Sequence, residues 1–205
     1  MLSQRCAGTI ENVIADAGED SVAGDLLERY KPANIVLVAG KIPHASPLEQ
    51  QTWETFSVNW HSDVRIAFHW LRETLLRPMP PGSRVVVFSS GAALNGSPVS
   101  GGYAGAKATQ RFITAYAQAE AERSGLDIKY TALMPRMTTA TDLGMYAAKA
   151  YAAYNGISED EQFQLMGEPI TPRIAGTAVV ELVQADAADV GAAYLLTSAG
   201  IKPLP

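Results

Sequence analysis

Two short apolar runs constrain the fold of this chain more than any other feature. Residues 35–39 read Ile-Val-Leu-Val-Ala, and residues 84–90 read Arg-Val-Val-Val-Phe-Ser-Ser. A strand with one face in water alternates apolar and polar residues, whereas a strand covered on both faces is apolar almost throughout. The two runs therefore predict strands of a parallel sheet that has helices on both of its faces.

The remaining segments alternate between strand and helix patterns. We expect further strands at 10–15, 128–134 and 193–197, and helices at 20–30, 48–76, 103–123, 143–154, 159–165 and 172–182. This alternation is typical of an α/β fold, and no repeat, low-complexity tract or linker divides the chain. The sequence predicts one α/β domain over residues 1–205.

Composition excludes several classes of function. The formal charge is −5 and the 16 basic residues are scattered, which argues against a nucleic-acid-binding or membrane-binding surface. The long uncharged stretch 85–106 is too rich in glycine and serine for a lipid-facing helix. Cys6 is the only cysteine, and Met1–Asn12 lacks the apolar core of a signal peptide. We expect a cytoplasmic protein without a disulfide or a cysteine-rich zinc site.

Tyr103 and Lys107 form the first part of a candidate catalytic group. They are four residues apart at the start of a predicted helix, so both side chains can point into one cleft. A nearby ammonium favours the phenolate, and we expect it to lower the pKa of Tyr103. Tyr103 is therefore a candidate proton donor and acceptor.

Ser90 and Asn59 complete the group. Ser90 ends a predicted buried strand, and ligands of parallel α/β sheets bind beyond the carboxyl ends of the strands. Asn59 is a polar residue among aromatic and apolar neighbours in the long helix predicted at 48–76.

This pattern resembles the short-chain dehydrogenase/reductase family. Ser90 and Tyr103 are 13 positions apart (103 − 90), as in the family's catalytic signature with Lys107, and Asn59 falls where the family keeps its asparagine. The resemblance also covers the run ending at Ala39-Gly40, the acid Asp16 and the run Leu133-Met134-Pro135. The match extends over essentially the whole chain. It implies a Rossmann-like, doubly wound parallel sheet.

The resemblance also implies an activity. A hydride would pass between NAD or NADP and a small alcohol or carbonyl substrate, with Tyr103 as acid and base and Ser90 bonded to the reacting oxygen. Lys107 would hold the nicotinamide ribose, and Asn59 would position a water that relays protons to Lys107. The residues implied in cofactor binding are Asp16, Ala39, Gly40, Tyr103, Lys107, Pro135 and Met137. A homodimer or homotetramer, packed through the two long helices, is implied as well.

The sequence departs from the family at its start. The glycine-rich turn that normally binds the pyrophosphate is absent, and the pattern begins near the family's third strand, as in an N-terminally truncated chain. The strand at 35–39 would then have an open edge, unless the strand at 10–15 fills it. Alternatively, Met1 is an internal residue of a longer protein. The choice between NAD and NADP is read after the second strand, which this pattern lacks.

Other interpretations stay open. The chain could be a catalytically silent relative that acts as a scaffold or regulatory protein after losing dinucleotide binding. Asp16 could instead cap a helix or form a turn, and residues 143–167 could be a substrate-binding segment or a surface helix pair. The tryptophans fit a core or a subunit interface. A metal site at His61, Asp63 and His69 is disfavoured, and no G-x-S-x-G elbow supports a serine hydrolase.

Overall fold

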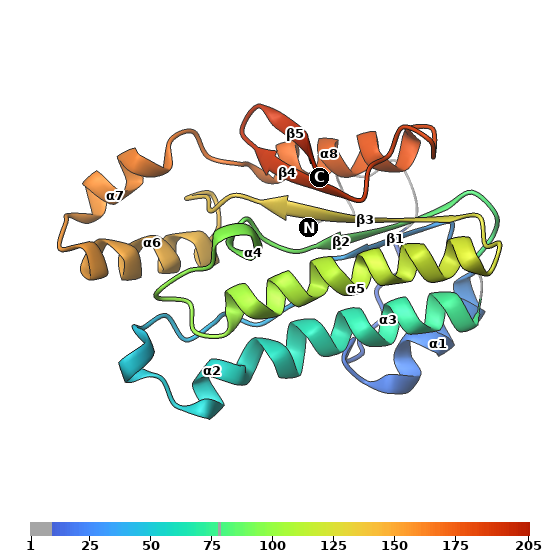
Figure 1. Cartoon of the computed structure of the whole chain (residues 1–205), viewed down its shortest axis with the longest axis horizontal. Helices are drawn as coiled ribbons and strands as arrows, with labels where there is room; N and C mark the ends of the chain where they lie inside the picture. Colours follow the sequence, from blue (N-terminus) through green and yellow to red (C-terminus); the bar gives the residue numbers. More distant parts are fainter. Residues whose placement is uncertain (1–9, 78) are drawn as a thin grey trace.

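Five strands form one sheet in the part of the chain that the computed structural model describes, residues 10–77 and 79–205 (Figure 1). Cys6 and most of the N-terminal stretch discussed above lie outside it. The strands follow the order β1-β2-β3-β4-β5 across the sheet, and only β5 is antiparallel to its neighbour. They are β1 (Asn34–Leu37), β2 (Ser83–Phe88), β3 (Ile128–Pro135), β4 (Ala193–Thr197) and β5 (Gly200–Leu204).

The helices lie close to their predicted positions. They are α1 (Asp20–Tyr30), α2 (Trp53–Asn59), α3 (Arg65–Leu76), α4 (Ala92–Asn95), α5 (Tyr103–Arg123), α6 (Asp142–Asn155), α7 (Glu159–Met166) and α8 (Pro172–Gln184). Hydroxyl side chains define several starts: Thr52, Thr141, Ser158 and Thr171 each accept a backbone N–H of the first turn. The prediction of an α/β chain with a parallel sheet is confirmed.

The helix predicted at 48–76 is not continuous. A 3₁₀ turn (Leu48–Gln50) precedes α2, and one π-helical stretch (Trp60–Val64) joins α2 to α3. A π turn widens the helix by one residue and rotates the side chains around it. This stretch carries Asp63 and becomes important at the candidate site.

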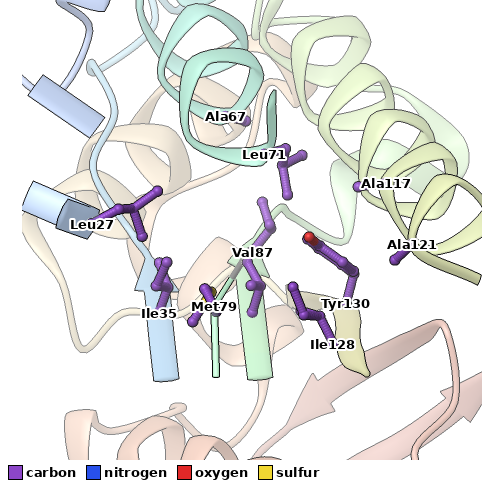
Figure 2. Packing of buried hydrophobic residues seen from close by; sticks show 11 residues of the cluster. Leu27, Ile35, Ala67, Leu71, Met79, Val87, Ala117, Ala121, Ile128 and Tyr130 are labelled. Atoms are coloured by element: carbon purple, nitrogen blue, oxygen red, sulfur yellow. The ribbon is translucent and has the colours of Figure 1, made fainter. Parts of the chain in front are cut away.

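The sheet is covered on both faces, as the apolar runs predicted. Val85 and Val87 of β2 pack with α1, α3 and α5, whereas Val86 between them packs with α8. Figure 2 shows the first cluster, in which Leu27 and Leu71 point from their helices toward the strands. At the carboxyl end of β3, α6 and α7 extend beyond the sheet (Figure 1).

The strand predicted at 10–15 is wrong. Residues 10–16 have no regular structure, and the side chain of Ile14 is fully exposed, at 102%. Glu11 instead turns outward and pairs with Arg29 of α1. The apolar residues of this segment find no covered face, so strand geometry would gain little there. Among the described residues β1 therefore pairs with β2 alone, and the predicted open edge is confirmed.

Strand β5 was not predicted. It contains Lys202 and Pro203, residue types that are depleted in strands. It forms because Gly200, with a φ of 108°, turns the chain back along β4 at the sheet's other edge. No helix among residues 10–77 and 79–205 is long and apolar enough to cross a membrane.

The burial of the sheet predicts a large difference between two leucine substitutions. Leu133→Ala in β3, where the side chain is 0% exposed, is expected to lower the free energy of unfolding by about 2–5 kcal/mol, because it leaves a cavity. Leu165→Ala in α7, at 71% exposure, should change it by less than about 0.5 kcal/mol. Urea unfolding measures both, and equal losses would contradict the described core.

Gly102 permits a close approach of α2 to the start of α5. Its N–H donates to the Phe56 carbonyl at 3.1 Å, and a Cβ at this position would overlap that same oxygen. Gly102→Ala is therefore expected to lower the free energy of unfolding by about 1–3 kcal/mol. Gly176→Ala is the matched control, because a Cβ there meets nothing within 4 Å in the exposed face of α8. In the same urea experiment, the free energy of unfolding of this control should rise by about 0.5–1 kcal/mol. Equal losses of unfolding free energy in both variants would contradict the close approach of α2 to the start of α5.

Candidate active site

A cavity of about 950 Å³ lies at the carboxyl ends of β1, β2 and β3. Residues that directly follow these strands form its base, and α5 and α6 form its sides. In parallel sheets this edge is where ligands bind. The residues that line it and that are discussed below are Gly40, Lys41, Asp63, Ser90, Leu94, Ser97, Val99, Tyr103, Lys107, Pro135, Arg136, Met137, Tyr146, Tyr151 and Ile170.

The structure brings Ser90, Tyr103 and Lys107 together in this cavity. Ser90 follows β2, and its Oγ accepts the Ala92 N–H at 3.2 Å. Tyr103 is the first residue of α5, and Lys107 lies one turn later with its Nζ 5.4 Å from the centre of the Tyr103 ring. The sequence predicted this convergence from the spacing of the three residues.

Lys107 is held from several sides. Its Nζ lies 3.0 Å from Asp63 Oδ2 and donates to the Phe88 carbonyl at 3.4 Å. Its own carbonyl accepts a hydrogen bond of 2.7 Å from Ser89 Oγ. Both charged side chains of the Lys107–Asp63 pair are buried, with exposed fractions of 7% and 1%.

The pKa of Tyr103 differs from the expectation. Burial raises the pKa of this phenol, the Ser90 hydroxyl beside it lowers the pKa, and the negative charge of Asp63 raises it further. The net direction is upward. The expected lowering of the pKa is therefore wrong for the described site, because burial of the phenol outweighs the Ser90 hydrogen bond and the Asp63 carboxylate adds to the rise.

Asn59 ends α2 and lies beneath the cavity without lining it. Its side chain is fully buried, and Nδ2 donates to the Lys41 carbonyl at 2.6 Å and to Asp63 Oδ1 at 3.3 Å. Its Oδ1 is also buried and accepts no hydrogen bond from the described residues. The amide thus links the segment after β1 to the Lys107–Asp63 pair.

The other residues implied in cofactor binding divide into two groups. Gly40, Pro135 and Met137 line the cavity, and Ala39 adjoins Gly40. Asp16 does not line it: its Oδ1 accepts the Gly18 N–H at 2.8 Å in the turn before α1. The turn interpretation of Asp16 describes its place in the structure, and its contact with a cofactor stays a prediction.

Asp63 is the residue that sequence reasoning missed. It was considered only as a metal ligand beside His61 and His69, yet it lines the cavity and contacts Lys107. A signal was present, since Asn59 and Asp63 are four residues apart on one helix face. No group of three His, Cys, Asp or Glu side chains within the described ranges could hold a metal ion.

Helix α6 closes one side of the cavity through two tyrosines. The hydroxyl of Tyr146 accepts the Ala45 N–H at 3.1 Å, and the hydroxyl of Tyr151 is hydrogen-bonded to Ser97 Oγ. These contacts join the segment after β1 and the segment after β2 to one helix. Within the segment 143–167, α6 thus borders the cavity, as the substrate-segment interpretation requires, while α7 does not line it.

The three tryptophans occupy different environments. Trp70 packs against the core cluster and donates to the Ala17 carbonyl at 3.2 Å. Trp53 and Trp60 are exposed. The core interpretation therefore holds for Trp70 only.

Comparison with known proteins connects this geometry to a set of solved structures. No family model matches the sequence, and no curated protein matches it. Among solved structures, the chain is similar to levodione reductase, with 22% identity and a TM-score of 0.78 over 95% of this chain and 77% of that one. It is also similar to an NAD⁺-bound xylitol dehydrogenase, with 15% identity and a TM-score of 0.75 over 88% of this chain and 75% of that one.

A third similar structure is a short-chain dehydrogenase family protein from Francisella tularensis subsp. tularensis SCHU S4. It shares 18% identity with a TM-score of 0.74, over 92% of this chain and 80% of that one. At such identities the likeness concerns the backbone. The chain has the fold of the short-chain dehydrogenases/reductases.

Proposed function

We propose that this chain is an oxidoreductase that transfers a hydride between NAD or NADP and a small alcohol or carbonyl compound. The observation that carries the proposal is the convergence of Tyr103, Ser90 and Lys107 on one cavity at the carboxyl ends of the strands. Dehydrogenases and reductases among the similar structures support it. A scaffold without catalysis has no physical need for this arrangement.

In this proposal Tyr103 moves the proton. Its phenol, half-buried at the start of α5, protonates the carbonyl oxygen during reduction, and its phenolate accepts the alcohol proton during oxidation. The Ser90 hydroxyl hydrogen-bonds the same substrate oxygen, and the Lys107 ammonium lies beside the Tyr103 ring, with its charge offset by Asp63. A tyrosine is protonated at neutral pH at its ordinary pKa, and the burial that raises the pKa of Tyr103 favours this form further, which suits protonation of a carbonyl oxygen.

The cavity fits the nicotinamide end of the cofactor. NAD or NADP, when bound, supplies or accepts the hydride. Gly40, Pro135 and Met137 border the cavity beside Tyr103 and Lys107, and the lysine offers an N–H to ribose hydroxyls. For the pyrophosphate, the described residues contain no glycine-rich turn, so the fit is supported at the nicotinamide end alone.

The walls of the cavity favour an apolar substrate. The apolar side chains on these walls are Leu94, Val99 and Ile170. The hydroxyls of Ser97 and Tyr151, which also line the cavity, are hydrogen-bonded to each other. Apolar wall residues bind the body of an uncharged molecule, and the polar groups between them orient it. A small carbonyl compound with an apolar body fits this surface.

Substitution at Tyr103 tests the chemistry. Tyr103→Phe is expected to lower kcat by at least about 10²-fold with little change in Tm, because it removes the proton carrier and keeps the ring. Tyr154→Phe is the matched control, since that tyrosine is exposed and does not line the cavity. Carbonyl-dependent oxidation of NADH or NADPH measures the turnover of both variants. Retained turnover in Tyr103→Phe would contradict the role of Tyr103 as proton carrier.

Calorimetric titration with NADH and with NADPH tests the cofactor. Saturable binding of one of them is expected, with loss of affinity in Lys107→Met. No binding of either nucleotide to the full chain would overturn the proposed function and favour a catalytically silent relative.

We also propose a homodimer or homotetramer that forms through α3 and α5. Phe68, Phe112 and Tyr116 are exposed on these two helices, which pack against each other. Several large apolar side chains on one surface mark a contact between chains. Phe112→Glu is expected to yield monomers in analytical ultracentrifugation, whereas Leu165→Glu, on the exposed face of α7, should leave the assembly unchanged. A wild-type monomer would contradict the interface.

A further inference from the structure

We propose that Asp63 is a positioning residue, whose carboxylate fixes the Lys107 ammonium beside the Tyr103 ring and thereby sets the pH range in which the site works. The inference deepens the proposed function and rests on it for the role of Tyr103. Its structural part, the buried pair of Asp63 and Lys107, stands on contacts alone.

The Asp63 carboxylate is held by hydrogen bonds to its own helical segment and to the segment after β1, and by its ion pair with Lys107. Oδ1 accepts the Lys41 N–H at 2.9 Å, Ser62 Oγ at 2.6 Å and Asn59 Nδ2 at 3.3 Å. Oδ2 faces Lys107 Nζ at 3.0 Å. One oxygen thus anchors the carboxylate to α2 and to the segment after β1, and the other is directed at the lysine.

The backbone around Asp63 directs its carboxylate toward Lys107. Asp63 lies in the π-helical stretch, and its carbonyl accepts a hydrogen bond of 2.8 Å from Gln110 Nε2 of α5. A Cβ at Gly40 would lie 2.6 Å from Asp63 Oδ2, so the carboxylate occupies space that only a glycine leaves. The π-helical stretch, α5 and the segment after β1 therefore all contribute to the placement of this one residue.

Stability alone gives little reason for such a pair. Removing two charges from water costs more than their attraction commonly returns, and apolar residues of similar volume often stabilise a protein as well or better. A buried pair that lines a cavity and contacts a tyrosine is better explained by what it does there. π-helical turns also concentrate at functional sites.

The contacts of Lys107 leave its ammonium one hydrogen-bond donor for the cavity. An ammonium has three donors. Asp63 Oδ2 takes one and the Phe88 carbonyl takes a second, at 3.4 Å. The third remains for the cavity that Lys107 lines, so the carboxylate determines where this donor points.

The Asp63–Lys107 pair also contributes to the electrostatic potential at the Tyr103 phenol. The titratable groups that line the cavity are Lys41, Asp63, Tyr103, Lys107, Arg136, Tyr146 and Tyr151. Asp63 is the only carboxylate among them, and its charge contributes to the raised pKa of Tyr103. Removing that charge leaves the Lys107 ammonium unopposed, which favours the phenolate.

The test is Asp63→Asn, which keeps the shape and removes the charge. We expect the pKa of Tyr103 to fall by about one unit or more. Ultraviolet titration of phenolate absorbance measures it, as the difference between each protein and its Tyr103→Phe counterpart. Asp25→Asn, on the exposed surface of α1, changes the net charge equally and should leave the titration unmoved. An unchanged Tyr103 titration in Asp63→Asn overturns the proposal.

The pH dependence of turnover gives a second readout. Alcohol oxidation needs the phenolate, so kcat/KM rises as pH rises through the pKa of Tyr103. In Asp63→Asn this rise should move to lower pH by the same amount as the phenolate titration. A uniform loss of rate without movement of the profile would assign Asp63 a merely structural role.

A third measurement needs no variant at position 63. In protein labelled with ¹⁵N-lysine, the Lys107 ammonium is expected as a slowly exchanging resonance that is absent from Lys107→Arg, because the pair is buried. Exchange as fast as that of exposed lysines overturns the pairing. Neither the phenolate titration nor this spectrum uses a nucleotide, so failure of cofactor binding and failure of the pair are told apart.

Discussion

The burial of β2 on both faces is the constraint on which the rest of the structure depends. Val85 and Val87 need helices on one side of the sheet, and Val86 needs a helix on the other. Parallel neighbours then require each connection to cross over the sheet. Because the connections leave from one edge, the segments after β1, β2 and β3 meet there and enclose the cavity.

The same constraint explains what could be predicted from sequence. Buried strands and amphipathic helices carry strong local patterns, so β2, α5 and their neighbours were expected close to their observed bounds. Ser90, Tyr103 and Lys107 could be brought together because each lies at a fixed distance from such an element. Their chemical roles stay predictions, as does the extent of the domain over residues 1–205.

What the sequence did not reveal depends on contacts between distant segments. Residues 10–15 look like a strand locally, but no neighbouring strand pairs with them in the described structure. Asp63 joins the site because one π-helical stretch turns it inward and Gly40 leaves room. The pKa of Tyr103 could not be inferred from Lys107 alone, since the charge that offsets this lysine comes from another helix. In each case tertiary contacts, and not the local pattern, decide the outcome.

Within residues 10–77 and 79–205, β1 pairs with β2 alone, and this open edge has a consequence for the site. Val36 and Val38 are exposed there, and the chain passes within a few residues to Gly40 and Lys41, whose backbone holds the Asp63 carboxylate. A strand with one neighbour opens more readily than one with two, so its amide hydrogens exchange earlier. The order of this edge and the placement of the Lys107 ammonium are thus thermodynamically linked. Local opening of β1 is expected to reach the Lys41 N–H and to remove one of the hydrogen bonds that hold the Asp63 carboxylate beside Lys107.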